Sequence, residues 1–273
     1  MALPNFLICG TQKGGTTALY HYLREHPEIF MPKVKEVHFF DLNWQRGLKW
    51  YEGYFEGVKN AKAIGEASPF YMYLEEVPKR IYEVLPDVKL IFILREPVSR
   101  AYSHYWHEVR LGYESLTFEE AIKMEEERLS TKDIFYRQQY SYKDRGKYVT
   151  QLRRYRKYFS DEQMLILLKE ELKKDPQKVM KEVFEFLGVN PEFKSPNWYT
   201  PHYIGESPRI WRLQQLKSKI SSPLLKKLID WINLKPGYPP INPQTKKSLN
   251  EYFKPYNNEL ERFLGKELTD WYK

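Results

Sequence analysis

The segment Phe6-Leu-Ile-Cys-Gly-Thr-Gln-Lys-Gly-Gly-Thr-Thr-Ala-Leu19 combines three features that together decide the fold. Residues 6–9 are apolar, which predicts a short strand buried on both faces. A glycine-rich turn follows, and residues 16–23 then predict a helix. A strand, a glycine-rich loop and a helix N-terminus in this order are typical of a phosphate-binding site, because the backbone N–H groups and the helix dipole favour an anion there.

The loop nearly matches the nucleotide-binding pattern G-x-x-x-x-G-K-[ST]. Gly10 and Gly15 have the required spacing, and Thr17 lies where a Mg²⁺-binding hydroxyl belongs. Thr16, however, replaces the lysine that contacts the β- and γ-phosphates of a nucleoside triphosphate. The one lysine of the loop, Lys13, lies in its middle. We therefore expect a nucleotide phosphate site that serves neither an ATPase nor a GTPase; a glycine-rich turn without a ligand is the alternative.

A second phosphate site is expected after another buried strand. Residues 89–94 are apolar after the first lysine and predict a parallel strand. This strand is followed by Arg95, where a Mg²⁺-dependent NTPase would place an acidic residue. An arginine at a strand end and a serine on the next helix, here Ser103, can hold a dianionic phosphate through charge-assisted hydrogen bonds.

These stretches resemble the sulfotransferases that use 3′-phosphoadenosine 5′-phosphosulfate (PAPS). Residues 12–19 are similar to the family's 5′-phosphosulfate loop, residues 95–105 to its 3′-phosphate site, and residues 33–41 to a Lys-Glu-x-His-Phe-Phe segment of its glycan and bacterial branches. The resemblance implies an α/β fold of the P-loop-NTPase-like type, with a central parallel sheet flanked by helices. It also implies a single domain over residues 1–273, in which a helical, proline- and aromatic-rich part from about residue 190 covers the cleft.

The resemblance implies roles for particular residues. The residues that would bind the cofactor are Lys13, Gly14, Gly15, Thr16, Thr17, Arg95, Ser103, Tyr148 and Arg209. Lys13 would also stabilise and protonate the leaving bridging oxygen. Glu66, expected just beyond a short strand at 63–65, would be the general base, and His38 would stabilise the sulfuryl oxygens or share the base role. Alternatives remain open: a core histidine at 38, a packing tyrosine at 148, and a loosely matched loop at 199–209.

The implied reaction is in-line transfer of a sulfuryl group from PAPS to a hydroxyl group, with adenosine 3′,5′-bisphosphate (PAP) as product and no metal required. The acceptor could be a glycan, a lipid, a hydroxylated small molecule or an acyl chain on a carrier protein. Two other functions are open: a P-loop kinase of nucleosides or small molecules, and a protein that binds anionic ligands without catalysis. The kinase would depend on MgATP, and the non-catalytic protein would tolerate replacement of Glu66 and His38.

Composition limits the protein class. The 273 residues carry a net charge of +8, which suits an anionic cofactor or substrate, and we expect no nucleic-acid partner. The single cysteine, Cys9, excludes an intramolecular disulfide. With no apolar run of transmembrane length and no room for a signal peptide before the first strand, we expect a cytoplasmic protein, bacterial by its branch resemblance.

The leucines and tryptophans of residues 210–234 are expected to pack internally, although closure of the acceptor cleft or contact with a membrane surface is an alternative.

Overall fold

The computed structural model describes residues 3–199 and 205–272, which form two compact units. Among them, the first unit contains residues 3–95 and 148–199, and the second contains residues 96–147 and 205–272. The prediction that residues 1–273 form one domain, with a C-terminal part over the cleft, stays a prediction. Each unit is described by itself below.

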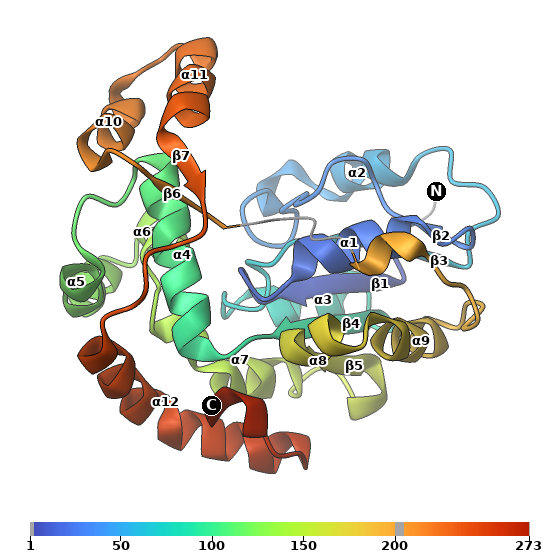
Figure 1. Ribbon diagram of the computed structural model, residues 1–273. Helices are drawn as coiled ribbons and strands as arrows, with labels where there is room; N and C mark the ends of the chain where they lie inside the picture. The colour runs from blue at the N-terminus through green and yellow to red at the C-terminus, as the bar shows by residue number, and fades with distance from the viewer. Residues whose placement is uncertain (1–2, 200–204, 273) are drawn as a thin grey trace. The chain divides into compact units, whose positions relative to one another are not determined.

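The first unit is built on a five-stranded parallel sheet with the strand order β2-β3-β1-β4-β5 (Figure 1). The strands are β1 (Phe6–Gly10), β2 (Ile29–Phe30), β3 (Ala63–Ala67), β4 (Lys89–Leu94) and β5 (Met164–Leu168). The helices of this unit are α1 (Thr16–Arg24), α2 (Leu48–Glu52), α3 (Val77–Val84), α7 (Tyr148–Tyr155), α8 (Lys169–Lys174) and α9 (Pro176–Leu187). The expected α/β class, with a central parallel sheet flanked by helices, is confirmed.

Helices cover both faces of this sheet. On one face, Ile8 and Ile93 share a buried cluster with residues of α1 and α9, such as Leu19 and Met180 (Figure 1). On the other face, Tyr155 of α7 lies edge-on to Phe92 of β4, with the ring centroids 4.9 Å apart. Because both faces are covered, residues 6–9 of β1 and 90–94 of β4 are apolar, as the sequence predicted.

The parallel arrangement places the ends of the strands together, and this positions the site. In β1 and β4, Ile8 pairs with Ile91; in β4 and β5, Leu94 pairs with Leu168. The carboxyl ends of parallel strands meet at one edge of a sheet, where ligands bind in open α/β folds. The segments that leave this edge begin at residues 11, 68, 95 and 169.

The second unit is mostly helical. Its helices are α4 (Pro97–Leu111), α5 (Phe118–Ser130), α6 (Ile134–Gln139), α10 (Trp211–Leu216), α11 (Pro223–Asn233) and α12 (Pro243–Leu264), and β6 (Glu206–Pro208) pairs antiparallel with β7 (Leu234–Pro236). α4 begins at a proline, and the side chain of Glu96 caps it by accepting hydrogen bonds from the backbone N–H groups of Val98 and Ser99. The hydrophobic core of the second unit includes Tyr105, Phe118 and Phe253.

Among the described residues, no helix has both the length and the apolar character needed to span a bilayer.

Candidate active site

The loop between β1 and α1 packs tightly against β4. The N–H of Thr11 donates to the carbonyl oxygen of Ile93 at 3.0 Å. A Cβ on Gly14 would lie 2.3 Å from the same oxygen, so only glycine fits this position. Lys13 and Gly15 have positive φ angles of 67° and 121°, which shape the turn. The loop expected from the sequence is therefore formed, with Lys13 in its middle.

The N-terminus of α1 suits an anion. Gly15 precedes the helix and has no side chain that could cap it, and the first turn carries no acidic residue. The first N–H groups of a helix lack intrahelical partners, and the helix dipole makes them favourable neighbours for negative charge. Thr16 is buried whereas Thr17 is partly exposed, so of the two hydroxyl groups that of Thr17 is the better placed to meet a ligand.

Two cations lie beside this loop. Arg95, directly after β4, donates from Nη1 to the carbonyl oxygen of Lys13 at 3.4 Å. Lys169, directly after β5, lies so close that a Cβ on Gly15 would be 3.7 Å from its Cγ. Burial, and then the charge of Arg95, lowers the pKa of Lys169 to about 8. A lysine held beside the N-terminus of α1 suits an anionic group.

Lys169 was missed by the sequence analysis. Its signal was available, because Lys169 directly follows the apolar run Met164–Leu168. The order of strands in the sheet, which places β5 next to β4, was not predicted, so the proximity of Lys169 to Arg95 could not be seen.

Tyr148 contacts the backbone of Arg95. It begins α7, is almost fully buried, and its hydroxyl donates to the carbonyl oxygen of Arg95 at 2.8 Å. This contact holds the backbone at the end of β4. We therefore interpret Tyr148 as a positioning residue for Arg95.

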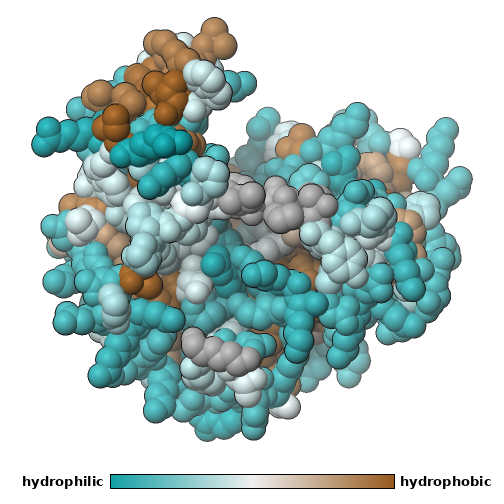
Figure 2. Space-filling model, in the orientation of Figure 1, coloured by the Kyte–Doolittle hydropathy of each residue, from teal (hydrophilic) through white to brown (hydrophobic). Residues whose placement is uncertain are grey.

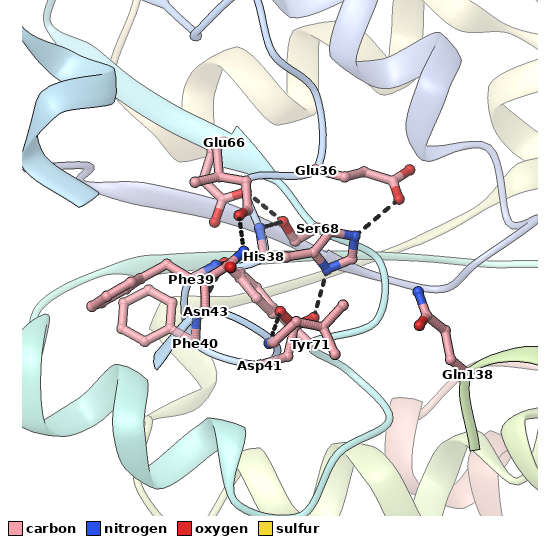
Figure 3. A network of polar contacts seen from close by, with 12 residues as sticks. Glu36, His38, Phe39, Phe40, Asp41, Asn43, Glu66, Ser68, Tyr71 and Gln138 are labelled. Carbon is pink, nitrogen blue, oxygen red and sulfur yellow. Dashed lines mark hydrogen bonds and ion pairs between the residues drawn. The ribbon is translucent and has the colours of Figure 1, made fainter. Parts of the chain in front are cut away.

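His38 lies between two carboxylates (Figure 3). Its Nδ1 is 2.8 Å from Oδ2 of Asp41, and its Nε2 is 3.4 Å from Oε2 of Glu36. The Asp41 side chain is fully buried, that of His38 is 16% exposed and that of Glu36 is 41% exposed. The three side chains thus form a chain of ion pairs that runs from the interior to the surface.

The charges in this chain are strongly coupled. Burial alone would lower the pKa of His38, but the hydrogen bonds and charges of Asp41 and Glu36 raise it to about 10. Burial alone would raise the pKa of Glu36, but His38 and the neighbouring Lys35 lower it to about 2. At neutral pH, His38 is therefore a cation and Glu36 an anion. Both also have positive φ angles, 66° for Glu36 and 55° for His38, a backbone strain that is concentrated at functional sites.

Glu66 differs from its predicted position. The strand continues to Ala67 instead of ending at residue 65, because the pairing with β1 extends through Leu7 opposite Glu66 and Ile8 opposite Ala67. Glu66 is only 1% exposed, and burial raises its pKa to about 7 despite hydrogen bonds from Tyr71 and Ser68.

Glu66 is linked to His38 through one side chain. The Ser68 hydroxyl donates to Oε2 of Glu66 at 2.8 Å and accepts from the backbone N–H of His38 at 3.0 Å. Figure 3 shows this link beside the Glu36–His38–Asp41 chain. In this arrangement Glu66 positions the segment that carries His38.

The remaining predicted residues belong to the second unit. Ser103 lies on α4, nearly buried, with its Oγ 3.3 Å from the hydroxyl of Tyr238. Arg100, also on α4, is fully buried and donates to the carbonyl oxygens of Ser141 and Tyr142. Arg209 is exposed directly after β6. The predicted loop at 199–209 falls partly outside the described residues, at 200–204, and the sharing of a phosphate by Arg95 and Ser103 stays a prediction.

Comparisons with known proteins identify the family of the chain. The sulfotransferase domain family matches residues 3–222. A mouse bifunctional heparan sulfate N-deacetylase/N-sulfotransferase 4 is 32% identical over 98% of this chain and 31% of its own length. A mouse heparan sulfate glucosamine 3-O-sulfotransferase 6 is 31% identical over 72% of this chain and 55% of its own. A crystal structure of a sulfotransferase from Alicyclobacillus acidocaldarius superimposes with a TM-score of 0.78 at 30% identity, covering 100% of both chains.

The chain therefore belongs to the sulfotransferase family, and the expectation of a PAPS-dependent sulfotransferase is confirmed at the level of this family. The P-loop-like sulfotransferase fold is confirmed as well. The chain spans about a third of the length of the bifunctional relative and about half that of the 3-O-sulfotransferase.

Proposed function

We propose that this protein transfers a sulfuryl group from PAPS to a hydroxyl group of a glycan. The observation that carries the proposal is that one unit combines an anion-binding loop, flanked by Arg95 and Lys169, with the Glu36–His38–Asp41 chain. Relatives named for heparan sulfate support a glycan over a lipid or a carrier-bound acyl chain as acceptor. A cytoplasmic location stays a prediction.

PAPS would supply the activated sulfuryl group and a phosphate leaving group. The loop residues 13–17 would hold the 5′ end, since their N–H groups and the Lys13 ammonium are donors for an anion. Lys13 would neutralise the charge that develops on the departing oxygen. Arg95 would bind the 3′-phosphate, as the resemblance implies.

Glu36 is the group that we assign to the acceptor's proton. It is ionised at neutral pH and its side chain reaches solvent, whereas Glu66 is buried and His38 is already protonated. His38 would orient Glu36 through Nε2 and stabilise negative charge on the sulfuryl oxygens, and Asp41 would hold the imidazole ring through Nδ1. The assignment of Glu66 as general base stays a prediction, and its burial favours a positioning role.

The test is a transfer assay with radiolabelled PAPS and a panel of acceptors that includes desulfated heparin, a hydroxylated lipid and a reaction without acceptor. We expect label in the polysaccharide and PAP formation that depends on it, without added metal. Consumption of MgATP without use of PAPS would support the kinase instead. A non-catalytic binder would be supported if the protein bound PAP without transferring label to any acceptor, and if a Glu36→Gln variant bound PAP like the wild type.

A further inference from the structure

α11 in the second unit exposes a large apolar face. Trp231 is 81% exposed and Leu224 is 78% exposed. Leu225, Leu228 and Ile232 are each exposed by about half. Figure 2 shows hydrophobic residues gathered over α11 and α10. The sequence-based expectation that these residues pack internally is therefore wrong for the face defined by Leu224, Leu225, Leu228, Trp231 and Ile232, which we call the α11 apolar face.

The side of α11 that faces the protein is largely polar, because Asn233 is buried there beside Ile229 and Asp230 is paired there. Asn233 is 1% exposed and donates from its side chain to the carbonyl oxygen of Ile210 at 2.9 Å and to Oε1 of Gln214 at 3.0 Å. Asp230 forms an ion pair with Lys217 at 2.6 Å. Surface helices normally turn their apolar stripe toward the core. Here the contacts of Asn233 and Asp230, together with buried Ile229, hold the helix with most of its apolar residues outward.

The surroundings of the α11 apolar face are basic. Residues 209–236 contain seven basic residues and one acidic residue, Asp230, which is paired with Lys217. Lys219, Lys227 and Lys235 are exposed. An apolar helix face with tryptophan and leucine, bordered by lysines, has the composition of a helix that lies in a membrane interface.

We infer that the α11 apolar face docks the protein onto the surface of an anionic phospholipid bilayer. The apolar side chains would enter the boundary between headgroups and acyl chains, and the lysines would contact the phosphate groups. A second copy of this chain fits less well, since a two-fold interface would bring the same lysines of both copies together. This inference goes beyond the proposed sulfuryl transfer and does not depend on it.

The experiment is flotation of the protein with vesicles of phosphatidylcholine alone and of phosphatidylcholine with phosphatidylglycerol. We expect binding that is strongest to the anionic vesicles. A Leu224→Ser/Leu228→Ser/Trp231→Ser variant should lower the partition coefficient by at least about 100-fold, because three large side chains lose apolar burial. Replacement of Lys226 and Lys227 by glutamine should weaken binding to anionic vesicles by roughly fivefold for each lysine.

The matched control is Ile134→Ser, which removes an exposed apolar side chain (42% exposed) of the same unit outside this face and should bind vesicles like the wild type. Because the three replaced side chains are exposed, the triple variant should retain the wild-type melting temperature. Absence of vesicle binding, or equal binding by the triple variant, would overturn the inference. If light scattering showed that the wild type is a dimer and the triple variant a monomer, the inference would be overturned in favour of a second copy of the chain.

Discussion

At the scale of single residues, His38 and Glu36 of the Glu36–His38–Asp41 chain have different roles: His38 is a proton donor and Glu36 a proton acceptor. Asp41 and Glu36 raise the pKa of His38 to about 10, and His38 and Lys35 lower that of Glu36 to about 2. His38 stays protonated at neutral pH and can donate, while Glu36 can accept. We therefore expect kcat to show no transition near pH 6.5, the ordinary pKa of histidine.

Replacement of Glu36 by glutamine should separate the chemical step from cofactor binding. General base catalysis contributes about 10²–10⁴-fold when the pKa of the base lies near the working pH. The pKa of Glu36 is about 2, so kcat of Glu36→Gln should fall by a factor at the low end of this range. The affinity for PAP, measured by calorimetry, should stay within about twofold, because Glu36 is not part of the phosphate loop.

Glu66→Gln is the matched control, since it changes the other candidate base by the same isosteric step. Its carboxyl group is buried and its pKa is raised to about 7, so the neutral amide resembles the protonated state. We expect a smaller loss of kcat than for Glu36→Gln. If Glu66→Gln were the more damaging change and Glu36→Gln nearly silent, Glu66 would be the base after all.

Lys169 should make the binding of PAP dependent on pH. Its pKa is lowered to about 8 in the unliganded protein, and a nearby phosphate would raise it, because opposite charges favour the protonated form. Above about pH 8, binding should therefore take up a proton, and the affinity should fall as pH rises further. Calorimetry at pH 8.5 in buffers of different ionisation enthalpy measures this uptake, and Lys169→Met should abolish it. Equal proton uptake in the variant would exclude Lys169 as the source.

At the scale of elements, the β1–loop–α1 segment depends on the absence of a side chain at residue 14. In Gly14→Ala, the added methyl group would meet the Ile93 carbonyl oxygen, so the loop or β4 must shift. Overpacking of this kind costs about 1–3 kcal/mol, and we expect that loss in urea unfolding together with weaker PAP binding.

Gly53→Ala is the control for this change, since a Cβ there would have no neighbour within 4 Å and the backbone of Gly53 has a φ of −57°. It should unfold like the wild type. Equal stability of the two alanine variants would show that the loop does not require close contact with β4.

The elements also show what the sequence could predict. β1, β4 and the loop between β1 and α1 were predictable, because unbroken apolar runs and closely spaced glycines are local signals. The extension of β3 through Glu66 was not, since a buried glutamate breaks the apolar pattern. Glu36 was overlooked because its role depends on a positive φ and on pairing with His38, which only the folded backbone reveals. The outward apolar face of α11 was missed because periodicity identifies a stripe but not what covers it.

At the scale of the whole molecule, the family match runs from residue 3 to residue 222 and so includes segments of both compact units. The residues for which the sequence predicts phosphate binding fall in both units: Lys13 and Arg95 in the first, Ser103 and Arg209 in the second. The net charge of +8 suits the anionic cofactor and the anionic bilayer proposed here.

The central claim is that this chain binds an adenosine 3′,5′-bisphosphate through the loop around Lys13. The most direct measurement is a thermal-shift titration of the wild-type protein with PAP, ADP and MgATP. A ligand that binds only the folded state stabilises it by about 2.7 kcal/mol at 100 times its Kd. We predict that PAP raises Tm without added metal and far more than ADP does. A rise with MgATP alone, or no rise with PAP, would contradict the account.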